Sequence, residues 1–260
     1  MPTRDRKIEI AVGGRRVEGT FVTPDTVAPG VLFVHGWGGN QQQYLARAQE
    51  LAGLGCVCLT FNLHANEQSA AEYETVTRED NLADVVAAYD RLASHAYVDT
   101  GAIAVVGSSY GGYLGAILSE VRPVRWLGLR APALYKDEDW TVPKRKLDVR
   151  DLAAYRRTSV RAAQNRALKA CAAFAGDVLI VESERDDIVP HPVIENYQAA
   201  FEKAYSRTYR VIAGADHALT RMEWQHAYTS ILVAWATEMM LGARKGGDAA
   251  AAEGRVRAAG

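Results

Sequence analysis

The chain has 260 residues, of which 48% are hydrophobic and 23% charged, proportions typical of an ordinary globular protein with one large core. Its formal net charge of −1 gives no electrostatic reason to expect nucleic acid or a membrane as a partner. No stretch approaches the roughly 18 consecutive apolar residues that a membrane span needs.

The amino terminus and the cysteines both predict a cytoplasmic protein. The first residues, MPTRDRKIEIAV, lack the apolar core and the cleavage site of a secretory signal. The three cysteines, Cys56, Cys58 and Cys171, have a spacing that fits neither a disulfide framework nor a zinc site. We therefore expect reduced thiols and no bound metal.

The first predicted element is a β-hairpin, followed by strands that alternate with helices. In KIEIAVGGRRVEGTFVTP, apolar and polar residues alternate on both sides of Gly13-Gly14, a pair typical of primed turns. Apolar runs downstream predict buried parallel strands at 31–35, 56–62, 102–107, 125–131, 178–184 and 207–214. The segments between them predict helices at 42–54, 111–120, 192–205 and 220–241, with another beginning at Thr77.

This alternation predicts a doubly wound, mostly parallel α/β sheet in a single domain over residues 1–242. Residues 132–176 are longer than one crossover needs and predict a small helical cap over the carboxyl edge of the sheet. This segment carries ten Lys or Arg against five Asp or Glu, which favours either anionic ester substrates or a solvated helical face. Residues 243–260 are rich in Ala and Gly without an apolar face, and predict a disordered tail.

One strand-to-helix junction carries a candidate nucleophile. Gly107-Ser108-Ser109-Tyr110-Gly111 fits the G-x-S-x-G pattern with Ser109 at its centre. The flanking glycines remove side chains that would clash at a sharp turn, and the amino end of the helix favours developing negative charge. The alternative is a tight turn that contains serine, so the interpretation depends on partners elsewhere in the chain.

Two later segments supply those partners. A serine hydroxyl needs a base, and the base needs a group that orients it. VLIVESERDDIVPHPV places acids just beyond a strand, and VIAGADHALT places His217 after the next strand. The ends of parallel strands share one edge, so both segments can reach Ser109. The order Ser109, acid, His217 is the one expected on this scaffold.

These segments resemble the α/β-hydrolase superfamily, specifically a serine esterase branch close to dienelactone hydrolases and prolyl-oligopeptidase-type domains. The resemblance covers residues 7–241 and is carried by HGWGG (35–39), GSSYGGY (107–113), DDIVP (186–190) and GADHAL (214–219). It implies an α/β-hydrolase fold and catalysis by a serine, a histidine and an acid, with no cofactor.

The resemblance assigns Ser109 as the nucleophile and His217 as the base. In the family the acid usually precedes Val-Pro in a D-x-x-V-P pattern, which selects Asp186 and leaves Asp187 as the competing choice. One segment departs from the family. After the second parallel strand many relatives have Asp, then Arg-Gly, then a later Gly, whereas this chain reads FNLHANEQS (61–69). Fewer glycines restrict the backbone of that loop, which leaves its shape open.

The oxyanion hole needs two backbone N–H groups that point at the developing negative charge. Tyr110, directly after the candidate nucleophile, should supply one, and by resemblance Trp37 supplies the other. Tyr135 and Trp140 are candidate substrate-binding residues in an acyl pocket, although ordinary core packing accounts for either equally well.

The expected function is hydrolysis of small-molecule carboxylic esters through an acyl-enzyme, by a monomer or homodimer. An amidase or peptidase of the same fold is the alternative within enzymes. A non-catalytic receptor that only binds ligand is the alternative outside them, and it is disfavoured because no position of the expected triad is lost.

Overall fold

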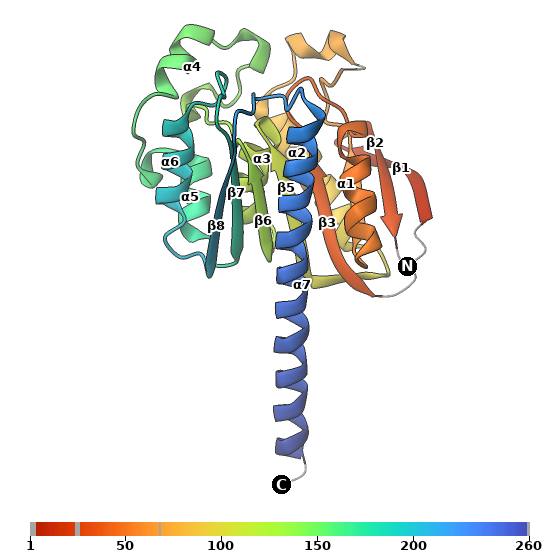
Figure 1. Cartoon of the computed structure of the whole chain (residues 1–260). Helices are drawn as coiled ribbons and strands as arrows, with labels where there is room; N and C mark the ends of the chain where they lie inside the picture. The colour runs from red at the N-terminus through yellow and green to blue at the C-terminus, as the bar shows by residue number, and fades with distance from the viewer. Residues whose placement is uncertain (1–3, 24–26, 68, 259–260) are drawn as a thin grey trace.

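An eight-stranded sheet forms the centre of the computed structural model, which describes residues 4–23, 27–67 and 69–258 (Figure 1). Its strand order is β1-β2-β4-β3-β5-β6-β7-β8. The strands are β1 (Arg4–Val12), β2 (Arg15–Thr23), β3 (Ala28–Val34), β4 (Val57–Phe61), β5 (Val98–Ser108), β6 (Trp126–Arg130), β7 (Asp177–Ser183) and β8 (Ser206–Ile212). The predicted mostly parallel α/β sheet is therefore confirmed.

The antiparallel part of the sheet is the predicted hairpin. β1 pairs with β2, and β2 pairs with β4, in antiparallel register, whereas every neighbouring pair from β4 to β8 is parallel. Gly13 and Gly14 form the turn with φ of +50° and +84°, the left-handed conformation that glycine adopts without a steric penalty. The parallel strands thus all end at one edge, where the later loops meet.

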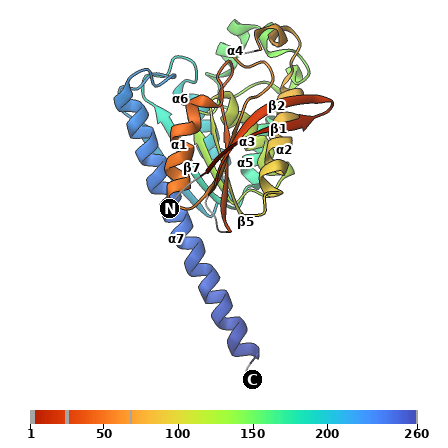
Figure 2. The ribbon, with the colours of Figure 1, turned by 90° about the vertical axis from the view of Figure 1, so that its right-hand side faces the viewer.

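Helices cover both faces of the sheet (Figure 2). α1 (Gln42–Gly53) and α7 (Met222–Ala258) pack on one face, and α2 (Arg78–Ala93), α3 (Tyr110–Val121), α5 (Arg166–Ala173) and α6 (His191–Ala200) on the other. Alternate side chains of β5 point to opposite faces of the sheet. Ile103 and Val105 face the layer of α2, α3, α5 and α6, and Ala104 and Val106 face the layer of α1 and α7. A strand buried on both faces explains why its sequence is continuously apolar.

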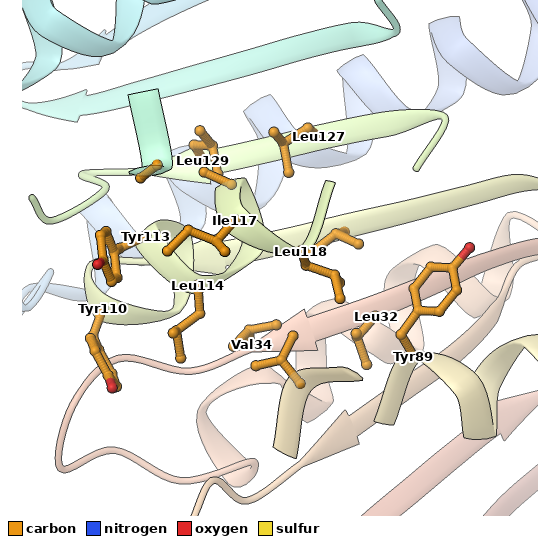
Figure 3. Packing of buried hydrophobic residues seen from close by; sticks show 14 of the residues in the cluster. Leu32, Val34, Tyr89, Tyr110, Tyr113, Leu114, Ile117, Leu118, Leu127 and Leu129 are labelled. Carbon is orange, nitrogen blue, oxygen red and sulfur yellow. The ribbon is translucent and has the colours of Figure 1, made fainter. Parts of the chain in front are cut away.

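The helix α3 is buried over most of its length: its residues from Tyr110 to Leu118 are all buried. Leu114 and Ile117 pack among side chains of β3 and β6, and Tyr89 of α2 lies near Leu32 and Leu118 (Figure 3). Burial of each large apolar side chain contributes about 1.5–3 kcal/mol. The helix that follows Ser109 is therefore held on every side, which limits movement of its first turn.

The helix α7 extends further than predicted. It packs on the sheet through Tyr228, Leu232 and Trp235, and its distal half points away from the sheet in both views (Figures 1 and 2). The sequence predicted a helix ending at 241 and a disordered tail at 243–260, whereas the structure continues the helix to Ala258. The run of alanines at 249–252 explains this difference, since alanine has the highest helix propensity. Residues 259–260 lie outside the described part.

The predicted cap segment divides into two parts. Short helical turns lie over the carboxyl edge of the sheet: η2 (Asp137–Asp139), η3 (Lys144–Lys146), α4 (Val149–Tyr155) and η4 (Ala162–Gln164). The helix α5, by contrast, packs against α3 and is the ordinary crossover between β6 and β7. The part that covers the edge therefore ends near residue 165, earlier than the predicted boundary at 176.

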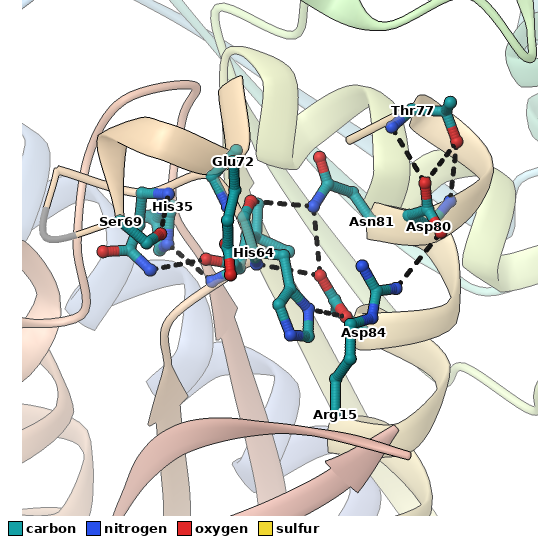
Figure 4. A network of polar contacts seen from close by, with 12 residues as sticks. Arg15, His35, His64, Ser69, Glu72, Thr77, Asp80, Asn81 and Asp84 are labelled. Atoms are coloured by element: carbon teal, nitrogen blue, oxygen red, sulfur yellow. Dashed lines mark hydrogen bonds and ion pairs between the residues drawn. The ribbon is translucent and has the colours of Figure 1, made fainter. Parts of the chain in front are cut away.

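A buried polar network joins the loops that follow β3 and β4 (Figure 4). The backbone N–H of Leu63 donates to His35 Nε2 (2.9 Å), so His35 is neutral there and its Nδ1–H donates to the carbonyl of Gly36 (2.7 Å). His64 Nδ1 lies 2.6 Å from Asp84 Oδ1, and both side chains are buried. These contacts hold the loop after β4, whose sequence (61–69) departs from the pattern expected of the family.

The network continues into α2 and reaches the start of α3. Asn81 donates to the carbonyl of His64 and to Asp84 Oδ2, both at 3.0 Å, and its Oδ1 accepts from the hydroxyl of Tyr110 (3.0 Å). Thr77 and Asp80 form the predicted helix start, with both hydrogen bonds of a capping box present. The network therefore links the loops after β3 and β4 with the helix α2 and the start of α3.

Alanine at position 65 adopts a backbone conformation that normally favours glycine. Ala65 has φ of +55° and is buried, and its N–H donates to Glu72 Oε2 (2.8 Å). A left-handed conformation costs a residue with a Cβ roughly 1–2 kcal/mol. The loop thus keeps a tight backbone course despite the loss of glycine, and the surrounding hydrogen bonds stabilise it.

We predict that His35 makes unfolding pH-dependent. Burial lowers its pKa from 6.5 to about 4, so the unfolded chain binds more protons between these values. The stability that His35 contributes is therefore complete above pH 6.5 and is lost as pH falls toward 4, by at most about 1.4 kcal/mol per pH unit. In urea unfolding, the stability gap between wild type and His35→Gln should narrow over this range.

The control for this experiment is His226→Gln, which removes an imidazole outside the network. A stability gap for His35→Gln that stays constant between pH 7 and pH 5 would contradict the assignment of a neutral, hydrogen-bonded His35.

Candidate active site

The predicted nucleophile sits on a strained corner between β5 and α3. Ser109 has φ of +53° and ψ of −117°, a conformation that residues with a Cβ rarely adopt. Its N–H donates to the carbonyl of Arg130 (2.9 Å), and its own carbonyl accepts from Ala133 (2.9 Å) and Tyr113 (3.1 Å). These bonds hold the corner on both sides, so the hydroxyl leaves the sheet in one direction.

The glycines on either side of Ser109 are required by space. A Cβ at Gly107 would lie 2.3 Å from the carbonyl oxygen of Gly111, and a Cβ at Gly111 would lie 2.1 Å from that of Val34. Both distances are far below van der Waals contact. The G-x-S-x-G pattern therefore exists because the first turn of α3 packs directly on the backbone of β3 and β5.

The structure brings together the three side chains that the sequence placed at separate strand ends. Ser109 Oγ lies 2.9 Å from His217 Nε2, and His217 Nδ1 lies 2.7 Å from Asp186 Oδ2. The carboxylate of Asp186 is 2% exposed, and the imidazole of His217 is 20% exposed. A hydroxyl, an imidazole and a buried carboxylate in this line form a proton relay of the kind that acyl transfer needs.

The loop after β7 decides between the two competing acids. Asp186 Oδ1 accepts backbone hydrogen bonds from Ile188 (2.9 Å) and Val189 (2.7 Å), which leaves Oδ2 facing His217. Asp187 lines the neighbouring pocket instead. The structure therefore places Asp186 where the D-x-x-V-P pattern predicted it, in contact with the imidazole.

The two residues expected to supply the oxyanion hole, Tyr110 and Trp37, belong to chain segments next to Ser109. Tyr110 is the first residue of α3, so its N–H has no acceptor within that helix. Trp37 lies in the turn closed by the bond from Gly39 N–H to Gly36 O (3.1 Å), and Gly38 there has φ of +71°. Glycine at this turn position permits the left-handed conformation that brings the backbone round.

A pocket of about 780 Å³ opens above Ser109 and His217. The loop of Trp37, the segment from Lys144 to Arg157 and residues near Asp187 form its walls. Tyr135 lines this pocket, as predicted, although it is only 3% exposed. Trp140, also predicted, does not line it, because its ring packs under the guanidinium groups of Arg78 (5.7 Å) and Arg166 (4.4 Å).

Sequence reasoning missed a buried arginine next to the three side chains. Arg130, at the end of β6, is 7% exposed and donates to the carbonyl of His217 (2.7 Å) and to Ser108 Oγ (3.2 Å). Its contact with the His217 backbone holds the loop that carries the imidazole. The one signal in the sequence is a charged residue at the end of the apolar run RWLGLRA, at the edge where the other groups gather.

The described part of the chain has neither a metal site nor a membrane-spanning helix. Across 4–23, 27–67 and 69–258, no group of three or more His, Cys, Asp or Glu side chains is arranged to hold a metal ion. Over the same residues, no helix combines the length and apolar character that crossing a bilayer requires.

Solved structures with the same fold include hydrolases of several kinds. A dienelactone hydrolase from Anabaena variabilis has a TM-score of 0.65 and 18% identity, over 91% of this chain and 98% of that chain. An esterase from Pyrococcus furiosus has a TM-score of 0.68 and 16% identity, and the match covers 92% of both chains. An acylaminoacyl peptidase from Pyrococcus horikoshii has a TM-score of 0.69 and 13% identity. That match covers 92% of this chain but only 42% of the peptidase.

Comparison with curated proteins found no match. The model of the prolyl oligopeptidase family matches residues 42–242, more than three quarters of the chain, including the segments that carry Ser109, Asp186 and His217. The predicted α/β-hydrolase superfamily is thereby confirmed, and the protein is a serine hydrolase. The chain belongs to the prolyl oligopeptidase family.

Proposed function

We propose that the protein hydrolyses carboxylic esters through an acyl-enzyme on Ser109. The observation that supports this proposal is the line from Ser109 Oγ to His217 Nε2 (2.9 Å) and from His217 Nδ1 to Asp186 (2.7 Å) at the base of an open pocket. No other arrangement in the described structure sets a hydroxyl against an imidazole that a buried carboxylate orients in this way.

In the acylation step, Ser109 Oγ forms a bond to the ester carbonyl carbon while His217 Nε2 takes the hydroxyl proton. The resulting oxyanion accepts hydrogen bonds from the N–H groups of Tyr110 and Trp37, and the partial positive charge at the start of α3 adds to them. The carbon–oxygen bond to the alcohol then breaks, and His217 returns the proton to the departing alcohol.

Deacylation repeats these steps with water. His217 takes a proton from water as the water oxygen attacks the acyl carbon, and the proton then returns to Ser109 Oγ as the acid leaves. Asp186 stabilises the imidazolium in both halves and holds the ring so that Nε2 faces the hydroxyl. Arg130 supports the same ring indirectly, because it binds the His217 carbonyl.

Hydrolysis of amides or peptides is the second candidate, and family membership favours it. The structural likenesses favour esters: this chain spans nearly the full length of the dienelactone hydrolase and the esterase, but less than half of the acylaminoacyl peptidase. An alcohol is also a better leaving group than an amine, so the relay alone meets the needs of ester cleavage. We therefore place esters first.

Ser109→Ala should abolish turnover of short 4-nitrophenyl esters, with a loss in kcat of at least about 10³-fold, because no nucleophile remains. A fluorophosphonate probe should label the wild type and not the variant. Circular dichroism should show that the fold is unchanged. Turnover that persists in the folded variant would refute the proposed function.

Asp186→Asn should lower kcat on the order of 10³- to 10⁴-fold, because a neutral amide cannot stabilise the imidazolium. The matched control is Asp187→Asn, which removes the same charge one residue along the loop and should reduce kcat far less. Steady-state kinetics of both variants check this assignment, and equal losses would contradict it.

Wild-type enzyme should cleave 4-nitrophenyl butyrate faster than the matched 4-nitroanilide, since the anilide nitrogen must be protonated before it leaves. The measurement is kcat/KM for the two substrates under one set of conditions. Preference for the anilide would instead establish amides as the substrate class.

A further inference from the structure

The pocket above Ser109 is strongly cationic. Its lining includes one carboxylate, Asp187, and six basic side chains, from Arg47, Arg130, Lys144, Arg145, Arg156 and Arg157. Four of these belong to the segment that covers the carboxyl edge, whereas Arg47 comes from α1 and Arg130 from β6. The positive charge thus comes from separate parts of the fold that converge on one cavity.

We propose that the pocket takes esters bearing a second, free carboxylate, and that Lys144 is the specificity-determining residue that binds it. This inference rests on the proposed ester hydrolysis and names its substrate class.

Lys144 is a half-buried ammonium with aromatic rings on several sides. Its Nζ lies 4.3 Å from the ring centroid of Trp37, 5.5 Å from that of Tyr110 and 5.6 Å from that of Tyr135. Burial lowers its pKa, which reflects loss of contact with water. Lys144 and Trp37 line the same pocket as Ser109, so this ammonium is within the cavity that a substrate would enter.

Lys144 has no ion pair with any carboxylate among the described residues. Other cations of the same covering segment are paired: Lys136 with Asp151 (2.6 Å) and Arg145 with Glu74 (3.9 Å). Lys144 is therefore a cation facing the pocket that the protein itself does not neutralise.

Two buried arginines strengthen the positive potential. Arg156 is 8% exposed and donates to the carbonyls of Leu134 (3.1 Å) and Ile188 (2.9 Å), and Arg130 likewise bonds to a carbonyl and to hydroxyls. Carbonyl and hydroxyl oxygens satisfy the N–H donors of a guanidinium but leave its net charge in place. Within the described part of the chain, neither guanidinium forms an ion pair with a carboxylate, so both charges add to the positive potential at the wall of the cavity.

Partly desolvated cations are costly unless an opposite charge comes near, and a bound anion would supply it. The remaining wall is partly apolar, with Leu147, Val149, Leu152 and Ile188, and the volume suits a small molecule. A carbon chain with an ester at one end and a carboxylate at the other matches this combination. Positive potential at the mouth would also attract such a substrate from solution.

The test compares two esters that differ in one group: the 4-nitrophenyl monoesters of pimelic acid, which ends in a carboxylate, and of pimelamic acid, which ends in a neutral amide. Wild type should favour the carboxylate in kcat/KM by at least about tenfold, the size expected of one charge-assisted contact. Added sodium chloride should reduce this ratio. A ratio near one would overturn the inference.

Lys144→Met keeps most of the aliphatic stem and removes the charge, and should bring the ratio close to one. Lys144→Arg should restore the preference for the carboxylate. The matched control is Lys146→Met, which removes an exposed charge from the same turn, η3, outside the pocket lining, and should keep the wild-type ratio. A Lys144→Met enzyme that keeps the wild-type ratio, or loses activity equally on both esters, would overturn the role of Lys144. If wild type cleaves neither ester, the proposed function itself fails.

Discussion

The close packing of the first turn of α3 on the carboxyl ends of β3 and β5 is the constraint on which the site depends. Gly107 and Gly111 permit a contact that any Cβ would block, at 2.3 and 2.1 Å from neighbouring carbonyl oxygens. Because the turn lies so close to the sheet, Ser109 adopts a strained conformation and its hydroxyl projects toward His217. The same turn makes Tyr110, directly after Ser109, the first residue of α3, so its N–H has no acceptor within the helix. Strain at one residue is offset by the burial of almost the whole helix behind it.

A second layer of polar contacts supports that corner from the neighbouring loops. His35 and Leu63 join the loops after β3 and β4, and Asn81 carries the connection to Tyr110. The sequence of the loop after β4, FNLHANEQS (61–69), departs from the pattern that the resemblance to the family leads one to expect. The pairing of His64 with Asp84 and the left-handed Ala65 show another way to keep a tight loop, with buried hydrogen bonds in place of backbone freedom.

Charge distinguishes the pocket from the molecule as a whole. The chain is almost neutral, yet the cavity gathers six basic side chains against one acid. Acidic partners neutralise cations such as Lys136 elsewhere on the covering segment, and carbonyl groups hold Arg130 and Arg156 without neutralising them. A fold can therefore build a local field of one sign that its total charge does not reveal, and such a field acts on the substrate at short range.

The sequence alone determined the sheet, the hairpin, the serine at the corner and the histidine, because apolar strand runs and turn residues are local signals and parallel strands end at one edge. It left two candidates for the acid of the triad, Asp186 and Asp187. In the structure the backbone N–H groups of Ile188 and Val189 donate to Asp186, which turns its other carboxylate oxygen toward the imidazole. Only the tertiary structure turned Trp140 away from the pocket and brought Arg130 against the loop of His217. The direction of a side chain depends on packing between segments distant in the chain, and no local pattern encodes that.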